Sequence, residues 1–260
     1  MLIKYELRRA FGHSFAIAFA LGVLSGIGGI FSYYSDTRWN DCSAISCFDA
    51  WLYCLSVSEG SFYRALFPVI ICLPYLPTVY SDRNSYFIFD ITSRMPYSRY
   101  LIIKTCVGVI SATSVVFLTL IFWLCICQAV FPPNLPTTEF NYLPKGAFSH
   151  LFVLHPTRYI AAVILLNIIT GALLYLLSMA LSFLAKNKRT VVGIPFAIYL
   201  LFILLSQIKG FSLINPIVLV APLEMSSCTF YQIILRWVFI MIIGSGGLYY
   251  FYRKDAREIL

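Results

Sequence analysis

Long stretches without charge dominate this sequence. Between Arg9 and Asp36 no Asp, Glu, Lys or Arg occurs, and residues 15–31 are apolar or small throughout. A helix needs about 20 consecutive apolar residues to cross the hydrocarbon core of a bilayer, so this stretch is long enough to cross. Hydrophobic residues make up 60% of the chain, whereas soluble domains contain roughly 45–50%. The sequence therefore predicts a protein that is surrounded mainly by lipid.

Six such stretches divide the chain, and we interpret each of them as a membrane-spanning helix. Their expected bounds are 15–34, 62–80, 105–131, 159–185, 190–208 and 229–252. The predicted fold class is therefore an all-α integral membrane protein, with residues 1–260 forming one transmembrane domain. Pro68, Pro74 and Pro77 are expected to kink the second span, which membrane helices tolerate when neighbouring groups satisfy the freed backbone.

A seventh apolar stretch, residues 211–223, is too short to cross comfortably, and Pro216 and Pro222 interrupt it. Stretches of this length are more typical of re-entrant or interfacial segments. We predict a re-entrant hairpin that dips in from the outer face before the last span. If the segment crossed instead, the C-terminus would move to the opposite side of the membrane.

The basic residues are distributed unevenly between the segments that join these spans. With the N-terminus inside, thirteen Lys and Arg residues lie in inner segments, namely Lys4, Arg8, Arg9, Arg83, Arg94, Arg99, Lys104, Lys186, Lys188, Arg189, Arg253, Lys254 and Arg257. Five lie in outer segments, namely Arg38, Arg64, Lys145, Arg158 and Lys209. An excess of bases is typical of the cytoplasmic side, so both termini are predicted to be cytoplasmic. Topology and anionic lipid headgroups explain the net charge of +8 better than a nucleic-acid partner does.

The first residues predict a further helix that does not cross. Ile3, Leu7 and Phe11 would share one helical face, and Lys4 and Arg8 lie beside them. This pattern favours a short amphipathic helix that lies in the cytoplasmic interface.

Motifs for enzymatic chemistry are missing from the sequence. The glycine-rich stretches at residues 25–32 and 244–247 lack the Lys-Ser/Thr of a phosphate-binding loop, so we expect them to serve close helix packing. His13, His150 and His155 do not form the His-Glu-x-x-His motif of a zinc protease. We therefore predict no catalytic residue, no metal site and no cofactor bound by this chain.

Two further side-chain questions stay open at this stage. Apart from Arg64 at the outer edge of the second span, Arg236 is the one charged residue within the predicted spans, and it would either contact an anionic substrate group, pair with Glu224, or extend toward the interface. Cys42 and Cys47 could form a disulfide if the segment that holds them is extracellular.

The order of these features resembles the permease subunits of ABC-2-type transporters. A basic amphipathic helix precedes six spans, a charged inner segment joins the second and third spans, and a short outer hairpin precedes the last one. Two stretches carry the likeness most closely, IKYELRRAF at residues 3–11 and SDRNSYFIFDITSRMPYSRYLIIK at residues 81–104.

The resemblance implies a function and a set of partners. Such permeases work as dimers, and cytosolic ATPase subunits bind the ATP and Mg²⁺ and dock on a coupling helix of the permease. It also implies a multi-pass protein of the bacterial plasma membrane that exports its substrate, forms a homodimer or a heterodimer, and faces its partner with spans one, two and five. The chain lacks the Leu-Gly-x-x-Trp pattern of polysaccharide exporters and a large extracellular domain, which favours export of amphipathic peptides or other hydrophobic compounds. Alternatives are an exporter of lipids or polysaccharide precursors, and a non-transporting membrane scaffold or sensor.

Residues 85–95 are the predicted coupling helix. Phe87, Ile91 and Met95 would form an apolar stripe on it, and Pro96 would end it. An interfacial helix lying on lipid would explain the stripe, but anionic headgroups would repel the nearby carboxylates. A groove on an ATPase would accept both the stripe and mixed charges on its rim. The residues expected to couple to the ATPase are therefore Asp82, Arg83, Phe87, Asp90, Ile91, Arg94 and Met95.

Overall fold

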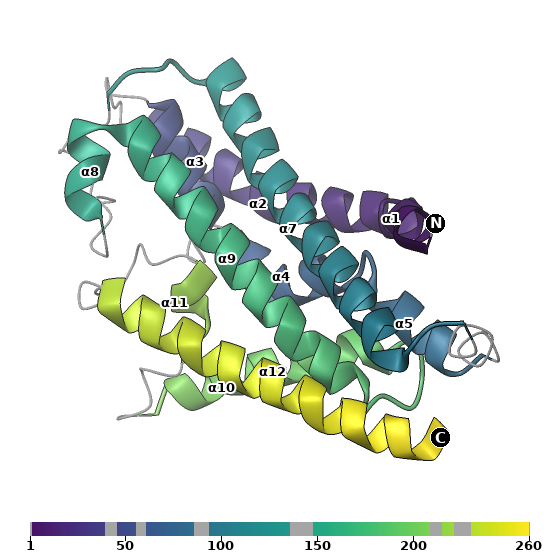
Figure 1. Cartoon of the computed structure of the whole chain (residues 1–260). Coiled ribbons are helices and arrows are strands. Elements are labelled where there is room, and N and C mark those ends of the chain that lie inside the picture. Colours follow the sequence, from purple (N-terminus) through teal and green to yellow (C-terminus); the bar gives the residue numbers. More distant parts are fainter. Residues whose placement is uncertain are drawn as a thin grey trace.

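The computed structural model describes residues 2–39, 46–55, 61–85, 94–135, 148–208, 215–220 and 230–259. All regular structure in these ranges is helical, as predicted (Figure 1). The helices are α1 (Leu2–Ala10), α2 (His13–Trp39), α3 (Cys47–Leu55), α4 (Tyr63–Cys72), α5 (Leu76–Arg83), α7 (Tyr97–Val130), α8 (Ser149–Leu154), α9 (Pro156–Ser182), α10 (Thr190–Ser206), α11 (Ile217–Val220) and α12 (Phe230–Ile259).

Within the described ranges, five helical segments are long and apolar enough to cross a membrane. They are Leu2–Ser35, Tyr63–Arg83, Tyr97–Val130, Pro156–Ser182 and Phe230–Lys254. The predicted fifth span corresponds to α10, whose 17 residues give a length of about 26 Å at 1.5 Å per residue. The chain therefore has the architecture of a multi-pass membrane protein, with a sixth helix that is shorter than the others.

The return path after α2 is longer and more broken than the predicted second span, 62–80. It begins where the Ser46 amide donates to the Tyr33 hydroxyl, passes the middle of α2 where the Phe62 amide donates to the Ser25 carbonyl, and ends at Asp82. Helix α3 supplies the first part of this path, and all nine of its residues are buried. The expected spans leave these residues in an outer connection, because a run of nine apolar residues is too short to cross a membrane.

The location of Arg64 also differs from the expectation. Arg64 was expected in an outer connection, but it lies in the first turn of α4 and is only 1% exposed. Since α3 lies beside the C-terminal half of α2, α4 starts inside the bundle. The Tyr199 hydroxyl of α10 donates to the Arg64 carbonyl and ties this start to α10.

The prolines of this path behave differently from one another. The helix breaks at residues 73–75, around Pro74, and α5 resumes with Pro77 in its first turn, where the missing amide hydrogen costs nothing. Pro68 is accommodated inside α4. The predicted interruption is therefore confirmed, and it is located at one turn.

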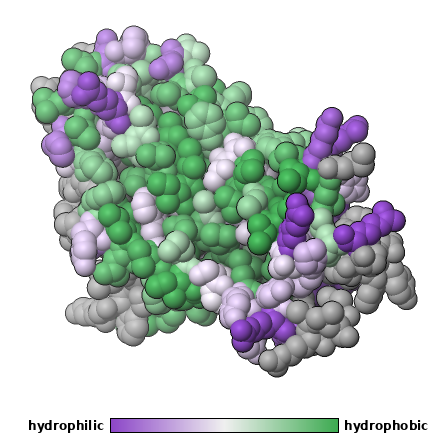
Figure 2. All heavy atoms as spheres, viewed as in Figure 1, coloured by the Kyte–Doolittle hydropathy of each residue, from purple (hydrophilic) through white to green (hydrophobic). Residues whose placement is uncertain are grey.

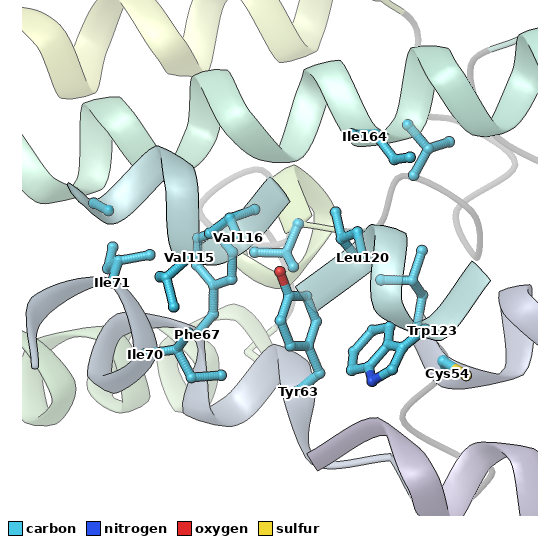
Figure 3. Close-up of a cluster of buried hydrophobic side chains, with 14 of the residues drawn as sticks. Cys54, Tyr63, Phe67, Ile70, Ile71, Val115, Val116, Leu120, Trp123 and Ile164 are labelled. Carbon is cyan, nitrogen blue, oxygen red and sulfur yellow. The ribbon is translucent and has the colours of Figure 1, made fainter. Parts of the chain in front are cut away.

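Aromatic and aliphatic side chains pack together in the buried core (Figure 3). Tyr63 meets Phe67 and Trp123 edge-on, with ring centroids 5.5 and 4.8 Å apart. The Trp123 indole nitrogen donates to the Val23 carbonyl of α2 over 3.1 Å, which fixes the ring against that helix.

The glycine-rich stretches serve helix packing, as predicted. A Cβ on Gly26 would lie 2.1 Å from the Trp123 ring, and one on Gly29 would lie 2.4 Å from the Tyr53 carbonyl oxygen. On α12, a Cβ at Gly244 would lie 3.1 Å from the backbone of α9, whereas Gly246 has open space around it. Glycine at these contact positions lets the backbones approach closely.

Helix α9 lies at the centre and packs against α7, α10 and α12. Of the predicted hairpin at 211–223, the structure describes residues 215–220, which include α11. The Thr170 hydroxyl, near the middle of α9, donates to the Leu219 carbonyl of α11 and accepts from the Trp237 indole of α12. Helix α11 is therefore held deep against α9.

Both termini lie at the same end of the bundle, and α3 and α8 lie toward the other end (Figure 1). The surface between the two ends is largely apolar, and hydrophilic residues gather at the ends (Figure 2). The predicted N-terminal helix is present as α1, but Glu6 and Ala10 are its buried residues. Ile3 and Phe11, which were expected on its apolar face, are 55% and 45% exposed.

Candidate functional site

Charged and phenolic side chains from three helices meet at the end that holds both termini. We call this set the charge cluster, and it consists of Glu6 and Arg9 of α1, Tyr75 and Asp82 at the two ends of α5, and Tyr100 and Lys104 of α7. Glu6 and Arg9 are three residues apart on α1, and Tyr100 and Lys104 are four apart on α7. Residues with this spacing are neighbours on a helix, so each of these two pairs shares one helical face.

Lys104 is the centre of the cluster. Its ammonium is fully buried and lies 2.8 Å from Glu6 Oε2 and 2.5 Å from Asp82 Oδ2. It also lies 5.1 Å from the centroid of the Tyr75 ring and 5.6 Å from that of Tyr100, within the range of a cation–π contact. One cation therefore joins the first helix of the chain to the end of α5.

Arg9 provides the second cation, nearer the surface. Its two terminal nitrogens donate to the two oxygens of Asp82 over 2.9 and 3.0 Å, the bidentate arrangement that gives a strong and oriented pair. The Tyr75 hydroxyl donates to Glu6 Oε2 over 2.7 Å, and the Tyr100 hydroxyl donates to Asp82 Oδ2 over 3.3 Å. Each carboxylate thus has at least two donors.

The charges of the cluster balance, with two carboxylates and two cations. Buried ion pairs repay their desolvation only when further hydrogen bonds complete them, and the two phenols supply those bonds. Among the described residues, Glu6 Oε1 is a buried oxygen without a hydrogen-bond partner. The ion pairs and hydrogen bonds of the cluster join three helices, so it is suited to holding them together.

The end of α5 is also tied to the connection between α9 and α10. The Tyr80 hydroxyl donates to the Lys186 carbonyl, and Arg83 donates to the Phe183 carbonyl over 3.1 Å while its guanidinium lies over the Phe183 ring. The residues just before the predicted coupling helix are therefore fixed to α1, to α7 and to the α9–α10 connection.

The predicted coupling residues divide into three groups. Asp82 is in the last turn of α5, is 5% exposed and is bonded within the chain. It was expected among the charges on the rim of a partner groove. The structure corrects this expectation, because its carboxylate accepts hydrogen bonds from Arg9 and Lys104 instead.

Arg83 and Met95 are partly exposed, and Arg94 is exposed. They flank residues 86–93, which lie outside the described ranges. Phe87, Asp90 and Ile91 belong to this segment. Ser85 donates to the Asp82 carbonyl and thereby closes the end of α5.

Arg236 is half-buried on α12, one residue before Trp237. Its proposed partner Glu224 lies outside the described residues. Cys47 is a buried free thiol, and Cys42 lies outside the described residues.

The sequence singled out Asp82, but it showed neither the bond between Asp82 and Lys104 nor the bond between Lys104 and Glu6. Lys104 was counted as an inner base, and Glu6 was passed over within a basic segment. A signal was available, since an acid among the bases of α1 needs a partner if it turns toward the apolar core. The sequence alone did not show which base that would be.

Comparisons with family models, with curated proteins and with solved structures find no match for this chain.

Proposed function

We propose that this chain is the transmembrane permease subunit of an ATP-driven exporter of the ABC-2 type. The observation that supports it best is the charge cluster. The two stretches that carry the family resemblance, 3–11 and 81–104, meet there through Glu6, Arg9, Asp82 and Lys104. Within a transporter, this junction gives the segment between Asp82 and Lys104 a firm connection to the transmembrane helices.

The mechanism follows from where that segment is attached. Residues 86–93 lie between α5 and α7, and the end of α5 and the beginning of α7 both contribute to the charge cluster. A cytosolic ATPase that grips Phe87, Ile91 and Met95 would therefore move α1, α5 and α7 together as it binds and hydrolyses ATP. Arg83, Asp90 and Arg94 would pair with charges on the rim of the ATPase groove, and Mg²⁺ and ATP would stay on the ATPase.

A second copy of the chain would complete the transporter, with the pathway between the two subunits. Exposed apolar side chains on α2 and α10, such as Phe31 at 71% and Leu204 at 69%, provide the surface for it. In the second span, Tyr63–Arg83, 56% of the apolar stretch is already buried within one chain. This span therefore contributes less to the surface for a second subunit. The substrate would be an amphipathic peptide or another hydrophobic compound, moved out across a bacterial plasma membrane. Helix α11 would belong to a re-entrant hairpin that caps the outer end of the pathway, and Arg236 would face an anionic substrate group.

The proposal is tested at the coupling segment. Phe87→Asp with Ile91→Asp places two carboxylates in the apolar stripe, so the ATPase should no longer copurify in mild detergent, or its substrate-stimulated ATP turnover should fall at least tenfold. Membrane insertion should be unchanged. The matched control is Leu184→Asp, an exposed apolar residue of the α9–α10 connection, which should retain the ATPase.

Two results would contradict the proposal in different ways. If the double variant keeps both copurification and turnover, the segment lies on lipid and does not dock. If no nucleotide-binding subunit copurifies with the wild-type chain, the chain is a scaffold or sensor without a transport role.

A further inference from the structure

A groove lies between the first turns of α7 and the last turns of α12. It encloses about 350 Å³, at the lower end of the range for small-molecule sites. Its walls are formed by Ser98, Leu101, Ile102, Thr105, Cys106, Ser245, Leu248, Tyr249 and Tyr252. The groove opens sideways on the apolar surface, because Ile102 and Tyr249 are 62% and 55% exposed.

One end of the groove lies beside a positive charge. The Arg253 guanidinium lies 4.7 Å from the centroid of the Tyr249 ring, which lines the groove. Ser98 and Tyr252 also line it, and the Tyr97 ring stacks on Tyr252 at 5.8 Å. Arg99 and Lys254 are exposed on the same two helices. The lining surface of the groove is almost entirely apolar.

Charge complementarity distinguishes between possible occupants. The groove follows eight residues of α12, from Ser245 to Tyr252, which is about 12 Å of helix. An apolar wall that leads toward the Arg253 guanidinium matches a hydrocarbon chain joined to an anionic headgroup.

We propose that this groove binds one anionic phospholipid, with an acyl chain along the apolar wall and the phosphate at the positively charged end. The phosphate would accept hydrogen bonds from Arg253 and from the hydroxyls of Ser98 and Tyr252. The site requires only that the chain is in a membrane, so it does not depend on the proposed transport function. Because the start of α7 also carries Tyr100 and Lys104, the bound lipid would hold α12 beside the charge cluster.

Lipid retention by the purified full-length chain tests the proposal. The chain in mild detergent is mixed with phosphatidylglycerol or with phosphatidylcholine, and bound lipid is counted by native mass spectrometry. The wild type should retain one phosphatidylglycerol molecule in preference to phosphatidylcholine. Arg253→Gln should reduce that preference about fivefold, the effect of one cation near an anionic lipid. Lys188→Gln, which removes an exposed charge of the α9–α10 connection, should leave it unchanged.

A pair of adjacent substitutions tests the apolar wall. Ser245→Trp would fill the groove and should abolish retention, whereas Gly246→Trp points into open space on the neighbouring face of α12 and should not. Equal retention of the two lipids by the wild type, or equal effects of the two Trp substitutions, would overturn the proposal. So would a wild-type chain that binds no lipid and whose dimer content changes only with Ser245→Trp, because that result would make the groove a protein interface.

Discussion

At the residue scale, the central feature is the buried ammonium of Lys104 between Glu6 and Asp82. Lys104→Met would keep a side chain of similar length but leave two buried carboxylates with one cation. Removing one partner of a buried ion pair typically costs about 3–5 kcal/mol. We expect a clear loss of thermal stability in detergent, and a smaller loss when Glu6→Gln is added, because the remaining Arg9–Asp82 pair is balanced.

The control for this prediction is Lys188→Met, since Lys188 is exposed and surface changes usually stay within about 0.5 kcal/mol. If the single Lys104 variant and the double variant have the same melting temperature, the cluster does not behave as a coupled set of charges.

The same residues show what sequence reasoning can reach at this scale. The pattern of apolar runs placed Lys104 in the inner segment just before the span expected at 105–131, whereas it is buried within α7, which begins at Tyr97. The partner could not be found in this way, because the bond from Lys104 to Glu6 joins residues 98 apart in the sequence. The burial of Arg64 could not be predicted for a related reason. It depends on α3, whose nine residues show no spanning pattern in the sequence.

At the element scale, the contact between α2 and α3 depends on a glycine. A Cβ on Gly29 would lie 2.4 Å from the backbone oxygen of Tyr53, and a backbone atom cannot move aside as a flexible side chain can. Gly29→Ala should therefore push α3 away from α2 and destabilise the chain by about 1–3 kcal/mol, the usual cost of overpacking. The melting temperature in detergent measures this effect.

Gly246→Ala is the matched control, because this glycine lies in helix α12 with nothing within 4 Å of its Cβ position. It should be neutral or slightly stabilising, since alanine favours the helix over glycine. A Gly29 variant as stable as the Gly246 variant would show that α3 can shift at no cost.

Element boundaries were predictable where the hydrophobic pattern was long. The bounds of α9, 156–182, differ by three residues at each end from the expected 159–185. Helix α7 begins at Tyr97, eight residues before the expected span, because Pro96 precedes it and nothing interrupts the helix after it. These extra turns carry Tyr100 and Lys104 into the charge cluster, so the error in the boundary concealed the site.

At the scale of the whole molecule, the number of crossings determines where the C-terminus lies. Both termini are at one end of the bundle (Figure 1), which requires an even number of crossings. The five long apolar helices alone would give an odd number. We therefore expect helix α10 to supply the sixth crossing, although its length of about 26 Å is below the roughly 30 Å of the hydrocarbon core. Local thinning of the bilayer accommodates such a mismatch at a modest cost.

We therefore expect both termini to be cytoplasmic, in agreement with the thirteen basic residues of the inner segments. Epitope tags placed on either end should react with antibody only after the cells are permeabilised. A third tag, inserted between residues 140 and 141 in the predicted outer connection, should react on intact cells and serves as the control. If the C-terminal tag reacts on intact cells while the N-terminal tag does not, the number of crossings is odd. In that case α10 does not cross, or residues 211–223 do, and the six-span topology is wrong.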